Sequence, residues 1–200
     1  MILKICGITN AEDAAAAMDC GATAIGFNFY PGSPRYVAPE IAASITSPRG
    51  IKRVGVFVNE SRHRIQAIAQ LARLDVAQLH GDEPVADYPA GILLWKAVRV
   101  DDAAKLGTLP DYPVQAVVLD GPAGHLYGGS GKPFDWRRAQ SLKRPFILAG
   151  GLDASNVAEA VALARPWGVD ACSRVESAPG RKDHRKMNEF LLAAKAALAL

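Results

Sequence analysis

Residues 146–172 read FILAGGLDASNVAEAVALARPWGVDAC, and they give the clearest indication of the fold class. It begins with a short apolar run, Phe146–Ala149, and ends with another, Val169–Cys172. Between them lies Val157–Ala164, which is rich in residues that favour a helix. The two outer runs are short and almost wholly apolar, as is typical of strands buried on both faces of a parallel sheet. The stretch therefore predicts a β-α-β unit.

The same alternation runs through the rest of the chain. Strands are predicted at Leu3–Cys6, Ala24–Asn28, Arg53–Val58, Val76–His80, Leu93–Val98, Ala116–Asp120, Phe146–Ala149 and Val169–Cys172. Helices are predicted at Ala11–Cys20, Pro39–Ser44, Arg62–Ala72, Phe134–Ser141, Val157–Ala164 and Lys182–Leu200. Eight such units predict an α/β protein with a single (β/α)8 TIM barrel over residues 1–200, near the lower length limit of that fold. A doubly wound open sheet is the alternative, although such sheets usually stop at about six strands.

Composition narrows the class of protein. Half of the 200 residues are hydrophobic and 22% are charged, which is ordinary for a globular domain. The net charge of +3 is small, and no basic stripe with interleaved aromatic residues indicates nucleic-acid binding. The chain begins without a signal peptide, and no apolar run approaches the roughly 20 residues that cross a bilayer, so we expect no membrane association.

The cysteines point to a reducing compartment. Cys6, Cys20 and Cys172 form no CxxC pair and no Cys/His spacing typical of a metal site. We therefore expect neither a disulfide framework nor a metal centre, and we expect a cytoplasmic protein.

Two reactive residues end predicted strands, where barrel enzymes place their catalytic groups. Cys6 precedes Gly7, and its thiol either packs as a small hydrophobe or faces the mouth of the barrel. Asp120 follows three apolar residues, and is either a turn residue or a carboxylic acid with a raised pKa. The loop after it, Gly121–Pro133, fits neither a phosphate-binding P-loop nor a dinucleotide fingerprint. We expect this loop to be a mobile lid that shields the site.

A phosphate site is predicted after the last two strands. Barrels often bind phosphate there with backbone N–H groups. Gly150 and Gly151 follow the seventh strand, and Ser173 and Arg174 follow the eighth. The alternative is that the two glycines serve only as turn residues.

Seven motifs together carry a resemblance to a known family. They are KICGIT from Lys4, SPRYV from Ser33, VGVFVNE from Val54, QLHGDE from Gln78, GGSGKPFDW from Gly128, LAGGL from Leu148 and VESAPGRKD from Val175. In this order they resemble phosphoribosylanthranilate isomerase, and the resemblance spans essentially the whole chain. It implies an aldose-ketose isomerase of tryptophan biosynthesis that catalyses an Amadori rearrangement of N-(5-phosphoribosyl)anthranilate without metal or coenzyme.

The resemblance also implies roles for particular residues. It makes Cys6 the general base, Asp120 the general acid and Arg35 the clamp for the anthranilate carboxylate. By their position Gln78 and His80 are expected to be supporting polar groups at the mouth, although His80 is alternatively a structural histidine. The partner implied is a small phosphoribosyl substrate, and we expect a monomer or a homodimer.

The sequence departs from the family pattern at two positions, and two other functions stay open. Arg174 stands where the family usually has Gly or Ala, and Cys172 stands where Ser or Asn is commoner; we expect Cys172 to be a packing substitution. The related aminoimidazole-carboxamide ribotide isomerase expects an aspartate in place of Cys6 and a duplication of two halves that this chain lacks. A non-catalytic phosphosugar-binding protein, its site spoiled by Arg174, is disfavoured because Cys6 and Asp120 are both present.

Overall fold

The computed structural model describes residues 1–100, 111–121 and 135–199, and in these ranges eight parallel strands close into a barrel. The strands are β1 (Ile2–Ile5), β2 (Ala24–Asn28), β3 (Lys52–Phe57), β4 (Val76–Leu79), β5 (Leu93–Arg99), β6 (Ala116–Asp120), β7 (Phe146–Leu148) and β8 (Gly168–Ala171). Each strand pairs with the next along the chain, and β1 pairs with β8 to close the ring. The predicted (β/α)8 barrel is confirmed, and the open doubly wound sheet is ruled out.

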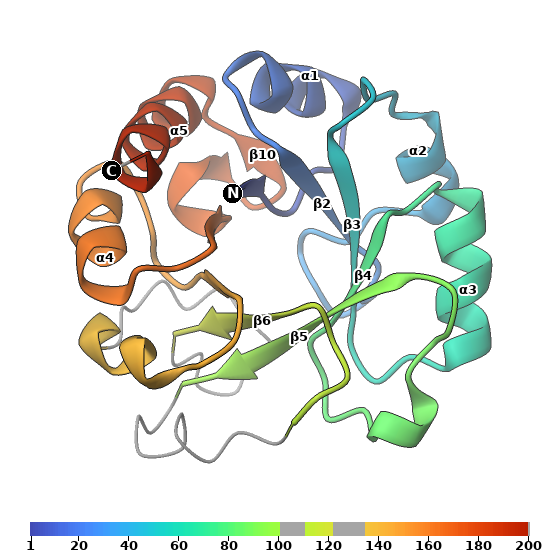
Figure 1. Cartoon of the computed structure of the whole chain (residues 1–200). Helices are drawn as coiled ribbons and strands as arrows, with labels where there is room; N and C mark the ends of the chain where they lie inside the picture. The colour runs from blue at the N-terminus through green and yellow to red at the C-terminus, as the bar shows by residue number, and fades with distance from the viewer. Residues whose placement is uncertain (101–110, 122–134, 200) are drawn as a thin grey trace.

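Helices surround this barrel (Figure 1). The α-helices are α1 (Ala11–Asp19), α2 (Pro39–Ser44), α3 (Arg62–Leu71), α4 (Val157–Ala164) and α5 (His184–Leu198), and the 3-10 helices are η1 (Val85–Asp87), η3 (Trp136–Ser141) and η4 (Ser173–Val175). The side chains of Asn10, Ser61 and Asp183 accept hydrogen bonds from N–H groups in the first turns of α1, α3 and α5. These caps satisfy N–H groups that the helix itself leaves unpaired, and so set where each helix begins. In the described part of the chain, no helix is both long and apolar enough to cross a membrane.

Two predicted segments differ from what the structure contains. The closing helix begins at His184 rather than Lys182, because β10 (Arg181–Lys182) pairs with β9 (Glu176–Ala178) in a small antiparallel hairpin before the helix. The helix predicted at Phe134–Ser141 is a 3-10 helix, η3, which spans Trp136–Ser141; Phe134 lies outside the described residues. The expected lid, Gly121–Pro133, lies outside the described residues apart from Gly121.

The alternation of side chains along the strands decides what lies inside the barrel. One buried cluster takes one or two residues from most strands, namely Ile2, Ala24, Val54, Val76, Trp95, Ala97, Ala116, Val118, Ile147 and Ala149. A larger cluster packs the intervening strand residues against the helices. Because successive side chains point to opposite faces, the residues two and four positions after each inner residue also point inward. Cys6 stands four positions after Ile2, His80 four after Val76, and Asp120 four after Ala116. All three side chains therefore point into the barrel at the C-terminal end of their strands.

A buried arginine ties two helices to the outside of the barrel. The guanidinium of Arg53 on β3 donates from Nε to Ala72 O, from Nη1 to Ile45 O and from Nη2 to Ala42 O. Ile45 and Ala72 are the residues that end α2 and α3, where a helix leaves its last carbonyls unpaired, whereas the Ala42 carbonyl also accepts from Ile45 N at 3.2 Å. The guanidinium also lies over the ring of Phe27, 4.9 Å from its centroid. Arg53 is therefore a structural residue.

Candidate active site

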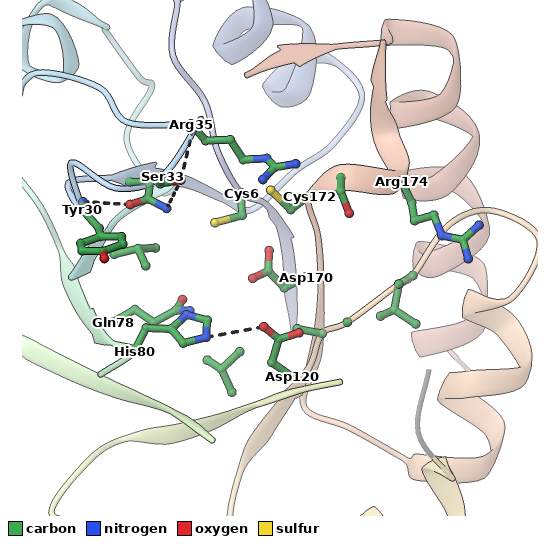
Figure 2. A pocket seen from close by; sticks show the side chains of 18 of the residues that line it. Cys6, Tyr30, Ser33, Arg35, Gln78, His80, Asp120, Asp170, Cys172 and Arg174 are labelled. Carbon is green, nitrogen blue, oxygen red and sulfur yellow. Dashed lines mark hydrogen bonds and ion pairs between the residues drawn. The ribbon is translucent and has the colours of Figure 1, made fainter. Parts of the chain in front are cut away.

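A cavity of about 270 Å³ opens at the C-terminal ends of the strands (Figure 2). Every site residue predicted from the sequence lines it: Cys6, Arg35, Gln78, His80, Asp120, Gly150, Gly151, Ser173 and Arg174. These residues are spread over most of the chain, and barrel closure brings them together. The structure therefore places one mixed polar and apolar site where barrel enzymes keep theirs.

Cys6 lies one residue beyond β1 and is surrounded by groups that favour its thiolate. Its pKa lies well below the usual value of 9.0, chiefly because Cys172 donates a hydrogen bond to it. Burial opposes this effect, while the ammonium groups of Lys4 and Lys182 reinforce it. A thiolate is a competent base at neutral pH, whereas an ordinary thiol is mostly protonated there.

Asp120, the last residue of β6, has the opposite tendency. Burial raises its pKa to about 6, although a hydrogen bond from the Gly121 backbone works against the rise. Near neutral pH a useful fraction of this carboxyl therefore still carries a proton. A thiolate and a protonated carboxyl facing one cavity supply a base and an acid at the same pH, as proton-transfer enzymes require.

His80 and Gln78 line the same cavity as these two groups. His80 Nε2 lies 3.5 Å from Asp120 Oδ2 (Figure 2), and burial lowers the pKa of the imidazole to about 4. His80 is therefore neutral at pH 7, and its contact with Asp120 is not an ion pair. Within the described residues, His80 Nε2 and Gln78 Oε1 are buried without a hydrogen-bond partner. Buried polar atoms are usually paired, so these two are suited to bonding a bound molecule.

Arg35 enters the cavity from the loop after β2 and is held by an acidic residue of β9. Its Nε and Nη2 donate to the two carboxylate oxygens of Glu176, at 2.9 and 2.8 Å. Lys182 Nζ donates to the same carboxylate at 2.9 Å. Although burial raises the pKa of Glu176, the bond from Arg35 and the nearby Lys182 keep it below 4.5. The bidentate grip fixes the plane of the guanidinium and leaves its Nη1 edge outside that bidentate pair.

The turn after β7 is built from two glycines with left-handed backbone. Gly150 has φ 82° and Gly151 has φ 70°, values that side-chain-bearing residues rarely adopt. A Cβ at Gly150 would also collide with the backbone of Gly121. Beside this turn Arg174 directs its guanidinium away from Cys6 and Asp120 (Figure 2), with Nη1 3.4 Å from Asp153 Oδ2. About half of the Arg174 side chain is exposed.

A buried ion pair under the site was not predicted from the sequence. Lys4 Nζ lies 2.6 Å from Asp170 Oδ2, and both side chains are buried inside the barrel. The ammonium is held charged, because Asp170 and Cys6 outweigh the effect of burial on its pKa. The signal for this pair was a charged residue at an inward position of each of two apolar strands. Pairing them required the register of β1 against β8, which aligns Lys4 with Asp170.

The expected role of Cys172 as a packing substitution is wrong. Cys172 lines the cavity and hydrogen-bonds to Cys6. Cys6 and Cys172 are the residues that directly follow the last register pair of β1 and β8, Ile5 with Ala171. The sequence held no sign of this contact, because the two cysteines are far apart along the chain.

Together the fold and the site define a class: a β/α-barrel enzyme that performs acid–base chemistry at the C-terminal rim. Among the described residues, no group of three or more His, Cys, Asp or Glu side chains is arranged to hold a metal ion. Comparisons with known proteins place the chain within this class. The family model for N-(5'phosphoribosyl)anthranilate (PRA) isomerase matches residues 3–193. The chain belongs to this family.

Individual relatives agree along the whole chain. The N-(5'-phosphoribosyl)anthranilate isomerase of Solibacter usitatus is 61% identical over 198 residues, which cover 99% of each chain. The crystal structure of phosphoribosyl anthranilate isomerase from Thermotoga maritima superposes with a TM-score of 0.88 at 40% identity, covering 98% of this chain and 100% of that one. A crystal structure of such an isomerase in complex with reduced 1-(o-carboxyphenylamino)-1-deoxyribulose 5-phosphate gives a TM-score of 0.86 at 38% identity, with the same coverage. The protein is accordingly an aldose-ketose isomerase of tryptophan biosynthesis.

Proposed function

We propose that Cys6 and Asp120 carry out the two proton transfers of the family's Amadori rearrangement. The substrate is N-(5'-phosphoribosyl)anthranilate and the product is 1-(2-carboxyphenylamino)-1-deoxyribulose 5-phosphate. One observation carries the assignment: a thiol with a lowered pKa and a carboxyl with a raised pKa face the same cavity. A site that lowers the pKa of one group and raises the pKa of another typically uses the first as a base and the second as an acid.

Asp120 acts first in this scheme. Its proton passes to the furanose ring oxygen, the bond from that oxygen to C1 breaks, and the electron pair of the anthranilate nitrogen forms a Schiff base with C1. With a pKa of about 6, roughly a tenth of the carboxyl is protonated at pH 7. That is far more than an exposed aspartic acid would offer, and it makes donation feasible without acid conditions.

Cys6 acts second. Its thiolate removes the proton from C2 of the sugar, and the Schiff base becomes an enolamine. In this step the C2–H electron pair forms the C1–C2 double bond while the electron pair of the C1–nitrogen double bond moves to nitrogen, and the resulting enolamine tautomerises to the ketone of the product. The thiolate can take this proton because Cys172, Lys4 and Lys182 favour its charged form in the free protein.

Arg35 holds the anthranilate carboxylate in this proposal. Glu176 already occupies Nε and Nη2, so the remaining Nη1 edge is the part that contacts the substrate. A guanidinium fixed in this way loses little side-chain freedom when substrate binds, which favours affinity. Gln78 and His80 line the same cavity as the two catalytic groups and offer buried polar atoms to the sugar hydroxyls.

The phosphate binds at the turn after β7 and the start of η4. Gly150 and Gly151 carry no side chain that would keep an anion from their backbone, and Ser173 adds a hydroxyl beside them. Arg174 contributes positive charge at the edge of this subsite, although its guanidinium lies next to Asp153. Backbone N–H groups are effective phosphate ligands because they need no reorganisation.

Turnover of the anthranilate substrate by Cys6→Ser and Asp120→Asn tests the assignment. Each variant should lower kcat by at least about 100-fold, because a positioned acid or base contributes about 10²–10⁴-fold. Affinity for the reduced product analogue should change far less. Cys20→Ser is the matched control, since Cys20 caps α1 away from the cavity. Near-normal turnover in Cys6→Ser removes the thiol from the mechanism, and equal losses of turnover and analogue affinity mean that the pocket itself was damaged.

A further inference from the structure

The backbone places Cys172 beside Cys6 at the spacing of two neighbouring strands. Register pairs of β1 and β8 run from Ile2 with Gly168 to Ile5 with Ala171. The bond from Cys6 N to Ala171 O at 2.9 Å belongs to this last pair, and Cys6 and Cys172 are the residues that directly follow it on the two strands. Neighbouring strands lie about 4.8 Å apart. This separation falls within the range of about 4.4–6.8 Å over which two Cα atoms can be joined by a disulfide.

Both sulfur atoms lie in the cavity, on the same side of the sheet (Figure 2). Gly7 leaves room for one of them, since a Cβ there would lie 3.1 Å from Cys172 Sγ. Gly26 leaves room for the other, since a Cβ there would lie 2.9 Å from Cys6 Sγ. Neither sulfur is walled off from the other by a side chain at these two glycines, and both cysteines lie outside the hydrogen-bonded register pairs of β1 and β8.

The pKa values of the two thiols are shifted in opposite directions, so that Cys6 is the one that reacts first with an oxidant. Cys6 has a lowered pKa and reaches solvent through the cavity, the two properties that mark a cysteine open to oxidation. The pKa of Cys172 is raised, first by its hydrogen bond to Cys6 and then by burial, whereas Lys182 and Arg35 lower it. Once the Cys6 sulfur is covalently capped, its negative charge is gone. Lys182 and Arg35 then favour the thiolate of Cys172.

We propose that Cys6 and Cys172 form a redox-reversible pair, in which an intramolecular disulfide switches the isomerase off. The Cys6 thiolate attacks one sulfur of a low-molecular-weight disulfide, breaks its S–S bond and releases one small thiolate. Cys172 gives its proton to solvent and attacks the Cys6 sulfur of the mixed disulfide, which releases the second small thiolate. The protein dithiol has then lost two electrons and two protons, and the small disulfide has been reduced to two thiols. The loss of activity rests on the proposed role of Cys6, whereas disulfide formation does not.

Equilibration with mixtures of reduced and oxidised glutathione tests the pair. The protein is quenched with acid, its free thiols are alkylated, and intact mass, peptide map and turnover are measured at each ratio. Of the three cysteines in the chain, only Cys20 should still be a free thiol in the oxidised form, and only Cys20 should therefore be alkylated. The peptide map should join Cys6 to Cys172, and turnover should fall with the same midpoint and return on reduction.

Two variants separate the possible outcomes. For each variant, the turnover after equilibration is expressed as a fraction of the turnover of the same variant in its fully reduced form. Cys20→Ser should follow the wild type. Cys172→Ser should need a ratio at least tenfold more oxidising to lose half of its activity, and its product should be a glutathione adduct rather than a cross-link. Absence of a Cys6–Cys172 cross-link, or equal sensitivity of Cys172→Ser and wild type, overturns the redox pair. A full cross-link with unchanged turnover overturns the switch and the catalytic role of Cys6, while leaving the disulfide established.

Discussion

Asp120→Asn should abolish turnover and at the same time stabilise the fold in a pH-dependent way. In the unfolded chain the carboxyl loses its proton near pH 3.8, whereas in the folded protein burial holds the proton until about pH 6. Between these values the folded state binds more protons, so the stability of the wild type falls as the pH rises. The difference corresponds to about 3 kcal/mol above pH 7, and to about 0.5 kcal/mol at pH 4. Asparagine does not titrate, so the variant escapes this loss.

Urea unfolding at pH 4, 6 and 8 measures the effect. The free energy of unfolding of the variant, minus that of the wild type, should grow by about 2.5 kcal/mol between pH 4 and pH 8. Any offset that comes from the amide itself is the same at every pH and drops out of this comparison. Asp87→Asn is the matched control because Asp87 is exposed on η1, and it should show no such growth. A constant or shrinking difference would refute the conclusion that burial keeps Asp120 protonated.

Three further changes test other parts of the structure. Arg174→Gly should weaken binding of the product analogue less than about tenfold, or 1.4 kcal/mol, by calorimetry, because its guanidinium lies beside an acidic residue and is half exposed; a much larger loss makes the arginine the principal phosphate ligand. Glu176→Gln should raise KM several-fold with a smaller change in kcat, because Arg35 loses its charged anchor; steady-state kinetics showing a loss in kcat alone would contradict this. Arg53→Met should lower the free energy of unfolding by about 3 kcal/mol in urea, because the Ala72 and Ile45 carbonyls lose the guanidinium donor and the Ala42 carbonyl loses one of its two donors. A loss below about 1 kcal/mol would mean that those carbonyls find other partners.

Much of the fold could be predicted because its signals are local. Each strand is indicated by a short apolar run. Three helices each begin at a polar cap residue that lies three positions before the N–H group it bonds. The ends of the strands then indicate where reactive residues gather. That logic located Cys6 and Asp120 correctly at the rim. The predicted start of α5 at Lys182 was wrong because Lys182 pairs with Glu176 in the β9–β10 hairpin, a contact between residues outside the helix.

The contacts around the site were harder to predict because they join residues far apart along the chain. Lys4 and Asp170 are separated by 166 positions, and Arg35 and Glu176 by 141. No local pattern links either pair. Residue type alone suggested a packing role for Cys172, and only the packed barrel reveals the partners of Cys172 and Arg35.

By itself the sequence determined the order of strands and helices and the kinds of reactive group at the strand ends, because these depend on the spacing of apolar and polar residues. The tertiary structure decided how the groups behave. Closing β1 against β8 set Cys6 beside Cys172 and over the charge of Lys4, and burial at the end of β6 raised the pKa of Asp120. The ionisation of a thiol or a carboxyl depends on the water removed from it and on the charges brought near it, and only the closed barrel fixes both.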